Sequence, residues 1–391
     1  MNKLLKRGLD QGLALNERAV ELANNAFDRM FRPGELVVSN RSEFDLIHQR
    51  ELLSVRRYRP LPVDEIILAD GTVVPVERPA RPVPVVLIPP LAASSVIFDL
   101  LPQRSLVRYM LARGYDVYLI DWGEPERDHS HLGIKDYTGD MLPEALDQVR
   151  ASSGQQDVSL MGWCMGGLFA LIYAGLSGDE HIRNIVTVAS PVDSRQGGIA
   201  GSLMTALNGP ARLVRQYTNF RVHDIDPRYL QVPGWVNALA FKLTNPVGSL
   251  VTYWDLLTRL WDREFVEAHT TTSTFLNNML NYPGGIIQDF FVKVGVNNDL
   301  SRGRIRIGDQ EADFERIRCN LLVFAGEADS IVRPAAAHRV MDLVRSEDKE
   351  FVVAPGGHMG VFGGAKAPEH VWRLAADWLG PRSTPAAGVP A

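Results

Sequence analysis

The chain has 391 residues, of which 46% are hydrophobic and 22% charged, with a formal net charge of −5. This balance is typical of a folded globular protein and argues against long disordered regions. Lysine and arginine form no cluster, so we expect no nucleic-acid partner. The two cysteines, Cys164 and Cys319, are too few for a disulfide framework and too far apart for metal-ligand spacing. We therefore expect a cytoplasmic protein without a bound metal.

Residues 1–63 begin with an amphipathic helix and continue into a lead-in segment. Apolar side chains recur every three or four residues between Leu5 and Met30, and Pro33-Gly34 ends the pattern. Charged residues interrupt it throughout, which excludes a signal peptide and a membrane span. The apolar face either packs on its own domain or docks on a partner subunit or an apolar particle, and the pattern leaves both open.

Residues 64–194 have the pattern of the first part of a mostly parallel sheet with helices on both faces. Two short runs joined by Asp70-Gly71 predict a hairpin. Runs that are apolar on both faces, with helix-length segments between them, are typical of parallel strands. They occupy residues 83–89, 116–121, 158–163 and 185–190.

The alternation of strands and helices stops at residues 195–310, which are helical and aromatic-rich. We expect this insertion to form a cap over the carboxyl edge of the sheet. The core resumes at residues 311–380 with strands at 321–326 and 350–357 and a final amphipathic helix. The tail, residues 381–391, is rich in Pro, Ala and Gly and is expected to be disordered.

The sequence GWCMGG follows the apolar run at 158–163 and predicts a sharp turn between a strand and a helix. Gly162, Gly166 and Gly167 surround Cys164, and such small residues let strand and helix approach closely around a nucleophile. A position at a helix N-terminus also favours the thiolate. The alternative is a buried, inert cysteine among packing glycines.

Two further residues fit a catalytic triad with Cys164. Asp329 follows the strand at 321–326, and His358 follows the strand at 350–357. Taken singly, each is an ordinary helix cap or histidine. Together they stand in the order nucleophile, acid, base at the ends of three strands, which predicts an α/β-hydrolase fold with a Cys-His-Asp triad. Cys319 precedes its strand and is interpreted as a structural thiol.

The predicted chemistry is acyl transfer. His358 would take the Cys164 proton, and Asp329 would hold the imidazole. The backbone N–H of Met165 and that of Leu91 or Ala92, in the turn after Pro89-Pro90, are the expected oxyanion donors. A cysteine that attacks a thioester forms another thioester at nearly equal free energy, so sulfur suits transfer to an alcohol under a cap that excludes water.

These segments also resemble polyhydroxyalkanoate synthases. GWCMGG is similar to the family's G-x-C-x-G-G box, and DVYLIDWG and PGGH resemble further segments of the short, two-subunit (class III-like) type. The resemblance implies an acyltransferase that polymerises (R)-3-hydroxyacyl groups from coenzyme A through Cys164, His358 and Asp329 and releases coenzyme A. It implies no cofactor, because the thioester is the substrate.

The resemblance also implies partners: an accessory synthase subunit and the surface of a polymer granule, with a homo-oligomer left open. The sequence departs from the family at two places. Ser330 follows the triad Asp, where members commonly have His. Many members carry a W-N-x-D pattern before a proline in the insertion, and the nearest sequence here is FLNN at 275–278. Substrate contacts are expected to differ there.

Two other functions share this scaffold. A hydrolase could cleave thioesters, lactones or polyesters through the same Cys164, and a non-catalytic relative could bind a granule or a partner. The pair His129 and His131 is interpreted as part of an exposed polar loop rather than a metal site, because no third ligand lies nearby in sequence. Asp121, at the end of a predicted strand, either reaches the site or forms a turn.

Overall fold

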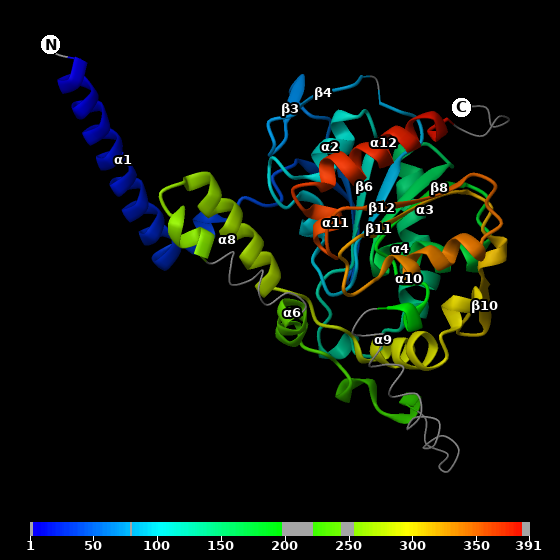
Figure 1. The fold of residues 1–391 in the computed structure, drawn as a ribbon. Helices are drawn as coiled ribbons and strands as arrows, with labels where there is room; N and C mark the ends of the chain where they lie inside the picture. The colour runs from blue at the N-terminus through cyan, green and yellow to red at the C-terminus, as the bar shows by residue number, and fades with distance from the viewer. Residues whose placement is uncertain (1–2, 79, 198–221, 244–253, 385–391) are drawn as a thin grey trace.

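The computed structural model describes residues 3–78, 80–197, 222–243 and 254–384, with side chains from residue 16 onward. Its centre is an eight-stranded sheet in the order β1-β2-β6-β5-β7-β8-β11-β12 (Figure 1). The strands of this sheet are β1 Phe44–Arg50, β2 Leu53–Tyr58, β5 Val85–Ile88, β6 Val117–Asp121, β7 Val158–Trp163, β8 Ile182–Val188, β11 Asn320–Gly326 and β12 Lys349–Ala354. From β6 to β12 neighbouring strands are parallel, as the sequence predicts.

Helices cover both faces of the sheet, and each face has its own apolar core. Along β5, Val86 and Ile88 join one core with α3 and α4, whereas Val85 and Leu87 join the other with α2 and α12. This alternation follows from the two-residue period of a strand. The helices of the core are α2 Leu106–Ala112, α3 Leu142–Ser153, α4 Met165–Ser177, α10 Pro334–His338, α11 Gly360–Gly363 and α12 Arg373–Leu379.

Short 3-10 and π-helical turns join these elements. The 3-10 turns are Pro33–Leu36, Ser95–Asp99, Arg127–His129, Ser194–Gln196, Val222–Asp224, Pro227–Tyr229, Asp299–Arg302, Phe314–Arg316, Arg339–Asp342 and Gly380–Arg382, and the π turns are Asp136–Met141, Phe290–Val296 and Pro368–Trp372. The predicted hairpin forms a separate two-stranded sheet from β3 Glu65–Ile67 and β4 Val73–Pro75.

The main sheet begins earlier than the expected core boundary at residue 64. Strands β1 and β2 pair antiparallel with each other, and β2 pairs antiparallel with β6. Most side chains of β1 are exposed or half-buried, because it lies at an edge of the sheet. An edge strand of this kind has no continuous apolar run. The sequence of residues 1–63 therefore did not predict it.

The insertion contributes helices α6 Gly234–Leu243, α8 Arg263–Asn277 and α9 Gly284–Asp289. It ends in a hairpin of β9 Arg304–Ile307 and β10 Gln310–Asp313, which the helical pattern of the sequence did not indicate. In Figure 1, α6 and α9 lie below the core, whereas α8 lies at its left side next to α1. Residues 198–221 and 244–253 of the expected cap lie outside the described residues.

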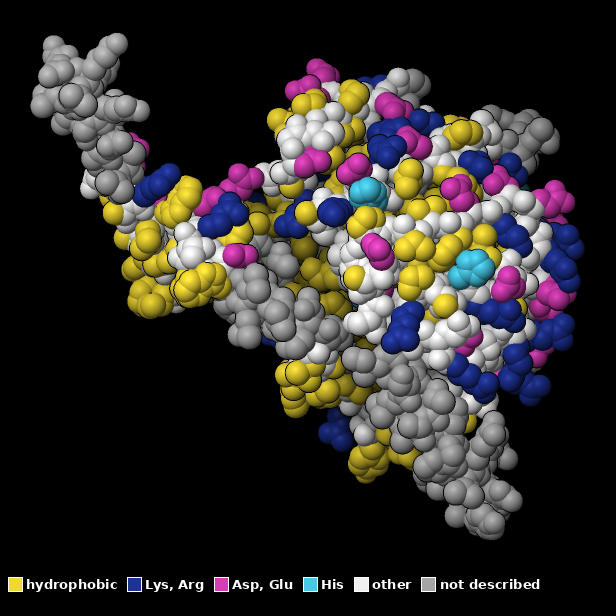
Figure 2. Space-filling model, viewed as in Figure 1, with side chains coloured by type: hydrophobic (Ala, Val, Ile, Leu, Met, Phe, Trp, Pro, Cys, Tyr) yellow, Lys and Arg dark blue, Asp and Glu magenta, His cyan; other side chains and the backbone are white. Residues whose placement is uncertain are grey.

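The N-terminal helix α1 Lys3–Phe31 extends away from the core and contacts α8 (Figure 1). Arg263 pairs with Asp28 at 2.5 Å, and the Asn25 amide donates to the Leu260 carbonyl at 2.9 Å. Several apolar side chains in the described part of α1 are exposed, among them Phe27, Met30 at 73% and Phe31, and Figure 2 shows hydrophobic side chains gathered over α1 and the neighbouring α8. None of the described helices is long and apolar enough to span a bilayer.

The first residues of the predicted tail belong to the fold. Arg382 pairs with Asp348 at 2.7 Å, and Ser383 is buried against the start of β5, where its hydroxyl donates to the Val83 carbonyl. Residues 385–391 of that tail lie outside the described residues.

Phe324→Ala tests the packing of the central sheet. Phe324 is fully buried in β11, so we expect truncation to lower the free energy of unfolding by about 3–5 kcal/mol. Urea denaturation followed by circular dichroism measures this loss. Val353→Ala in the adjacent β12 is the control, because Val353 is 47% exposed and should lose less than about 1 kcal/mol. Equal losses in both variants would contradict the core assignment.

Candidate active site

Cys164 occupies the turn between β7 and α4. Its backbone has φ 54° and ψ −118°, a strained conformation for any residue other than glycine. Its N–H donates to the Val188 carbonyl at 2.8 Å, and its carbonyl accepts from the Leu168 N–H at 3.2 Å. These bonds fix the turn to β8 on one side and to α4 on the other, and the thiol stays partly exposed. The geometry is that of a nucleophile turn.

The glycines around Cys164 permit this turn. A Cβ on Gly166 would lie 2.0 Å from the Ile88 carbonyl oxygen, and one on Gly162 would lie 2.2 Å from the Gly167 nitrogen. Both clashes are with backbone, which cannot rotate away. The start of α4 can therefore approach β5 and β7 only with glycine at these positions.

Asp329 and His358 meet at the same edge of the sheet. His358 Nδ1 and Asp329 Oδ2 are 2.8 Å apart, and both side chains are almost completely buried. The other Asp329 oxygen accepts the backbone N–H groups of Ile331 and Val332, each at 2.8 Å. The carboxylate is thus fixed by the loop after β11, and its bond to Nδ1 leaves Nε2 of His358 for another partner.

Cys164 lies near enough to His358 for its charge to help raise the pKa of the imidazole. Trp163, the residue before the cysteine, holds the histidine loop in place: its indole N–H donates to the His358 carbonyl at 3.2 Å, and its ring stacks on Phe362. The structure therefore brings the three predicted triad residues together, while their catalytic roles stay a prediction.

The environment of His358 favours its charged form. Burial alone lowers the pKa of an imidazole, but the negative charge of Cys164 and the hydrogen bond to Asp329 outweigh it and raise the pKa of His358 above its ordinary 6.5. At neutral pH this arrangement favours an imidazolium next to the sulfur. A cation in this place increases the reactivity of a thiol.

The two predicted oxyanion donors lie at the start of α4 and in the turn after β5. Met165 is the first residue of α4, where the backbone N–H groups of a helix have no intrahelical acceptor. Leu91 is buried in the turn that follows β5, the strand next to β7 in the sheet. Their role as donors stays a prediction.

Sequence reasoning missed one residue at this site, Tyr282 of the insertion. Its hydroxyl donates to the Met165 sulfur at 3.1 Å. Burial first, and then the charge of Cys164, raise the pKa of Tyr282, so the phenol stays protonated. Tyr282 precedes Pro283 in an irregular segment with no periodic pattern, and no sequence rule points to it.

Other residues singled out in the sequence have structural contacts. Asp121 pairs with Arg56 at 2.5 Å and accepts the Gly123 N–H at 3.0 Å, so it forms a turn. His129 accepts the Glu126 N–H at 3.0 Å. In the described part of the chain no three His, Cys, Asp or Glu residues are grouped to hold a metal ion.

His131 and the two departures from the synthase pattern lie in different surroundings. His131 contacts the Asp128 carbonyl at 2.9 Å. Ser330, one of the two departures from the synthase pattern, is exposed, whereas Phe275 of the other is buried in α8 and packs in the same core as Trp163. Of these departures, the one at 275–278 thus includes a residue of the core beside the site.

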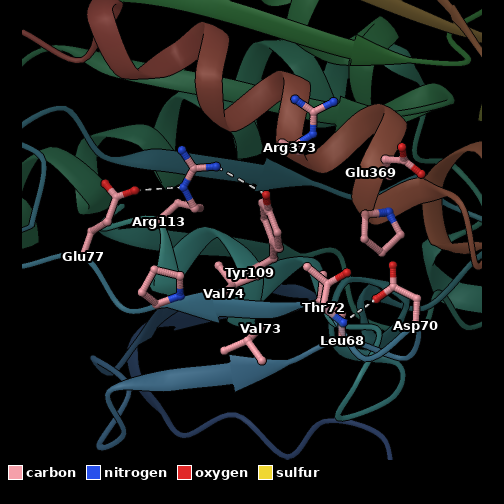
Figure 3. Close-up of a pocket in the computed structure, with 12 residues that line it drawn as sticks. Leu68, Asp70, Thr72, Val73, Val74, Glu77, Tyr109, Arg113, Glu369 and Arg373 are labelled. Atoms are coloured by element: carbon pink, nitrogen blue, oxygen red, sulfur yellow. Dashed lines mark hydrogen bonds and ion pairs between the residues drawn. The ribbon is translucent and has the colours of Figure 1, made fainter.

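A separate hollow of about 580 Å³ lies between the β3–β4 hairpin, α2 and the C-terminal helices (Figure 3). Cys164 does not line it. Its central cation, Arg113, donates to Glu77 at 2.9 Å, to Asp377 at 2.7 Å and to the Tyr109 hydroxyl at 3.3 Å. Because these charges compensate one another, they hold the hairpin against the helices and do not indicate a ligand site.

Comparison with known proteins gives the same class as the geometry. The model of the alpha/beta hydrolase fold family matches residues 83–365, so the chain belongs to that family. Among solved structures, the chain is similar to a soluble variant of monoglyceride lipase from Saccharomyces cerevisiae, with a TM-score of 0.51 at 14% identity. The match covers 89% of this chain and 97% of the lipase chain. At this identity the likeness shows the fold alone.

The curated sequence relatives narrow this class. The chain is similar to "Poly(3-hydroxyalkanoate) polymerase subunit PhaC" of Haloferax mediterranei, 30% identical over 302 residues, and of Allochromatium vinosum, 28% identical over 306 residues. The first match covers 77% of this chain and 59% of the relative, and the second covers 78% and 82%. The chain thus spans about three fifths of the haloarchaeal relative. These matches confirm the resemblance to polyhydroxyalkanoate synthases.

Alkylation by iodoacetamide tests the pairing of Cys164 with His358. At pH 7 we expect His358→Gln to slow alkylation of Cys164 about tenfold, because the imidazolium beside the sulfur is lost. The raised pKa of His358 sets the sign: its charge is present at neutral pH and disappears as the pH rises through that value. The difference between wild type and variant should therefore vanish in alkaline solution.

Cys319 serves as the internal control for this experiment. Burial raises the pKa of Cys319 to about 12, so Cys164→Ser should leave the protein almost unlabelled at pH 7. Peptide mass spectrometry identifies the labelled cysteine. Equal labelling of wild type and His358→Gln at pH 7 would contradict the pairing.

Gly166→Ala tests the close approach of α4 to β5. The added methyl meets the Ile88 carbonyl, so α4 must shift, and we expect a loss of about 2 kcal/mol or more in stability together with loss of the fast alkylation of Cys164. Thermal denaturation and the labelling rate measure the two effects. Gly34→Ala is the matched control, because no atom lies within 4 Å of its added Cβ and it should behave as wild type.

Proposed function

We propose that the chain is an acyltransferase of the polyhydroxyalkanoate synthase type, which polymerises (R)-3-hydroxyacyl groups from coenzyme A and releases coenzyme A. The observation that carries the proposal is the 2.8 Å contact between His358 and Asp329 beside the thiol of a strained nucleophile turn. The polymerase names of the curated relatives give the substrate class.

The first half-reaction acylates Cys164. Cys164 reacts as the thiolate, with its proton already held by the His358 imidazolium, and the sulfur adds to the thioester carbonyl of the substrate. The resulting oxyanion is stabilised by the N–H groups of Met165 and Leu91. The carbon–sulfur bond to coenzyme A then breaks, and the leaving thiolate takes the proton from His358.

The second half-reaction moves the acyl group to an alcohol. The 3-hydroxyl of another unit loses its proton to His358 and attacks the Cys164 thioester, which forms an ester bond and frees the sulfur. Because both thioesters have similar free energy, Cys164 keeps the acyl group activated for this step. Asp329 holds the imidazole in the orientation that both half-reactions need.

We also propose an accessory subunit and a polymer surface as partners. The relatives carry the word "subunit" in their names, and the exposed apolar side chains of α1, among them Phe27, Met30 and Phe31, supply a face suited to either contact. No cofactor takes part in this proposal, since the thioester itself supplies the activated acyl group.

An assay with purified protein and 3-hydroxybutyryl-coenzyme A tests the activity. We expect release of coenzyme A with accumulation of insoluble polymer, and a fall of at least about 10³-fold in Cys164→Ala, because the covalent intermediate cannot form. Cys319→Ala is the matched control and should retain activity. Release of coenzyme A with only soluble free acid would replace transfer by hydrolysis, and no release at all would contradict catalysis on this substrate.

A further inference from the structure

Residues 280–282 of the insertion cross from the cap to the carboxyl edge of the sheet. The Leu280 N–H donates to the Ala92 carbonyl at 2.8 Å, in the turn that carries the predicted donor Leu91. The Asn281 side chain donates to the Pro125 carbonyl at 3.0 Å. Three successive residues are thus fixed in position, because Tyr282 is held as well.

The backbone of Tyr282 is held from the cap side. Its N–H donates to the Val232 carbonyl at 2.9 Å, and its carbonyl accepts from the Val232 N–H at 3.1 Å. Gly284, two residues later, lies so close to Pro227 that a Cβ would come within 1.7 Å of the Pro227 carbonyl oxygen. The tyrosine is therefore positioned by the main chain on both sides.

The side chain of Tyr282 lies beside Met165, the residue that follows the predicted nucleophile. It packs against the same apolar core as Cys164, and the charge of Cys164 contributes to the raised pKa of the phenol. Its hydroxyl donates to the Met165 thioether at 3.1 Å, and a thioether sulfur is a weak acceptor. The O–H group of a protonated phenol in this position can therefore leave the thioether and donate its hydrogen bond to a stronger acceptor.

We propose that Tyr282 is a catalytic residue, whose hydroxyl leaves the Met165 sulfur and donates to the substrate carbonyl oxygen as that oxygen becomes negatively charged. The acceptor would then be an oxyanion instead of a thioether, so the hydrogen bond strengthens in the transition state. The phenol keeps its proton throughout, and the step needs no further reactant. This inference rests on the proposed function, because it requires an acyl carbonyl at Cys164.

The position of Tyr282 agrees with this role. Met165 contributes both the thioether that the phenol contacts and the first free N–H of α4, so the phenol and this predicted donor meet at the same residue. The predicted backbone donors come from the sheet edge, whereas Tyr282 comes from the insertion. The insertion would thereby supply one group of the site itself in addition to covering it.

Tyr282→Phe is the test, because it removes the hydroxyl and keeps the ring. With 3-hydroxybutyryl-coenzyme A we expect kcat for coenzyme A release to fall 10- to 100-fold while KM changes less than threefold. Alkylation of Cys164 by iodoacetamide should stay within twofold of wild type, since alkylation forms no oxyanion. Tyr229→Phe, at an 80% exposed tyrosine of the same insertion, is the matched control and should match wild type in every measurement.

Two results would overturn the inference. In one, Tyr282→Phe releases coenzyme A within twofold of the wild-type rate. In the other, alkylation falls as much as turnover, which would mean that the hydroxyl only supports the fold around Cys164.

A failure of the proposed function is distinguishable from a failure of this inference. If wild type does not turn over the thioester, acylation of Cys164 by p-nitrophenyl butyrate, followed by mass spectrometry, gives the same comparison of Tyr282→Phe with Tyr229→Phe. A wild-type protein acylated by neither substrate would overturn both proposals.

Discussion

The site depends on the contact between the start of α4 and the backbone of β5. Only glycine is small enough to permit this contact. At Gly166 the helix approaches the Ile88 carbonyl so closely that even a methyl group cannot fit. This contact holds the turn at Cys164 in its left-handed conformation and aims the N-terminus of α4 at the edge of the sheet. The reactive group, the helix dipole and the free N–H groups of the first turn are therefore positioned by one packing constraint.

The triad could be predicted from the sequence because its geometry follows from the topology of the sheet. Parallel strands end at the same edge, so Cys164, Asp329 and His358 are brought together once their strands are recognised. The predicted parallel strands β5, β6, β7, β8 and β11 are mostly buried, as strands covered on both faces must be, whereas the sixth, β12, is a partly exposed edge strand. The His358 loop needed no local pattern, since Trp163 at the end of β7 and the Asp329 carboxylate after β11 hold it in place.

The parts that the sequence did not predict lack such a pattern. Strand β1 lies at the edge of the sheet with most of its side chains in contact with water, so hydrophobic periodicity cannot identify it. Tyr282 reaches Met165 because Leu280 and Asn281 bind two separate turns of the core, and contacts between residues so far apart in the chain are not encoded by local spacing. Local sequence patterns predict the fold class and the turn that carries Cys164. The way the insertion meets the core is set by tertiary contacts, which such patterns do not contain.

The bonds from residues 280–282 to the core also limit how a large product of the proposed reaction could leave the site. Leu280 is tied to Ala92, so moving the segment aside would pull on the turn beside Leu91 at the moment when that turn is needed. The polymer of the proposed reaction, which lengthens in every cycle, would therefore require an exit that bypasses residues 280–282. Growth of the product and closure of the site are compatible only if the chain leaves along a different side of the nucleophile from the one that Tyr282 occupies.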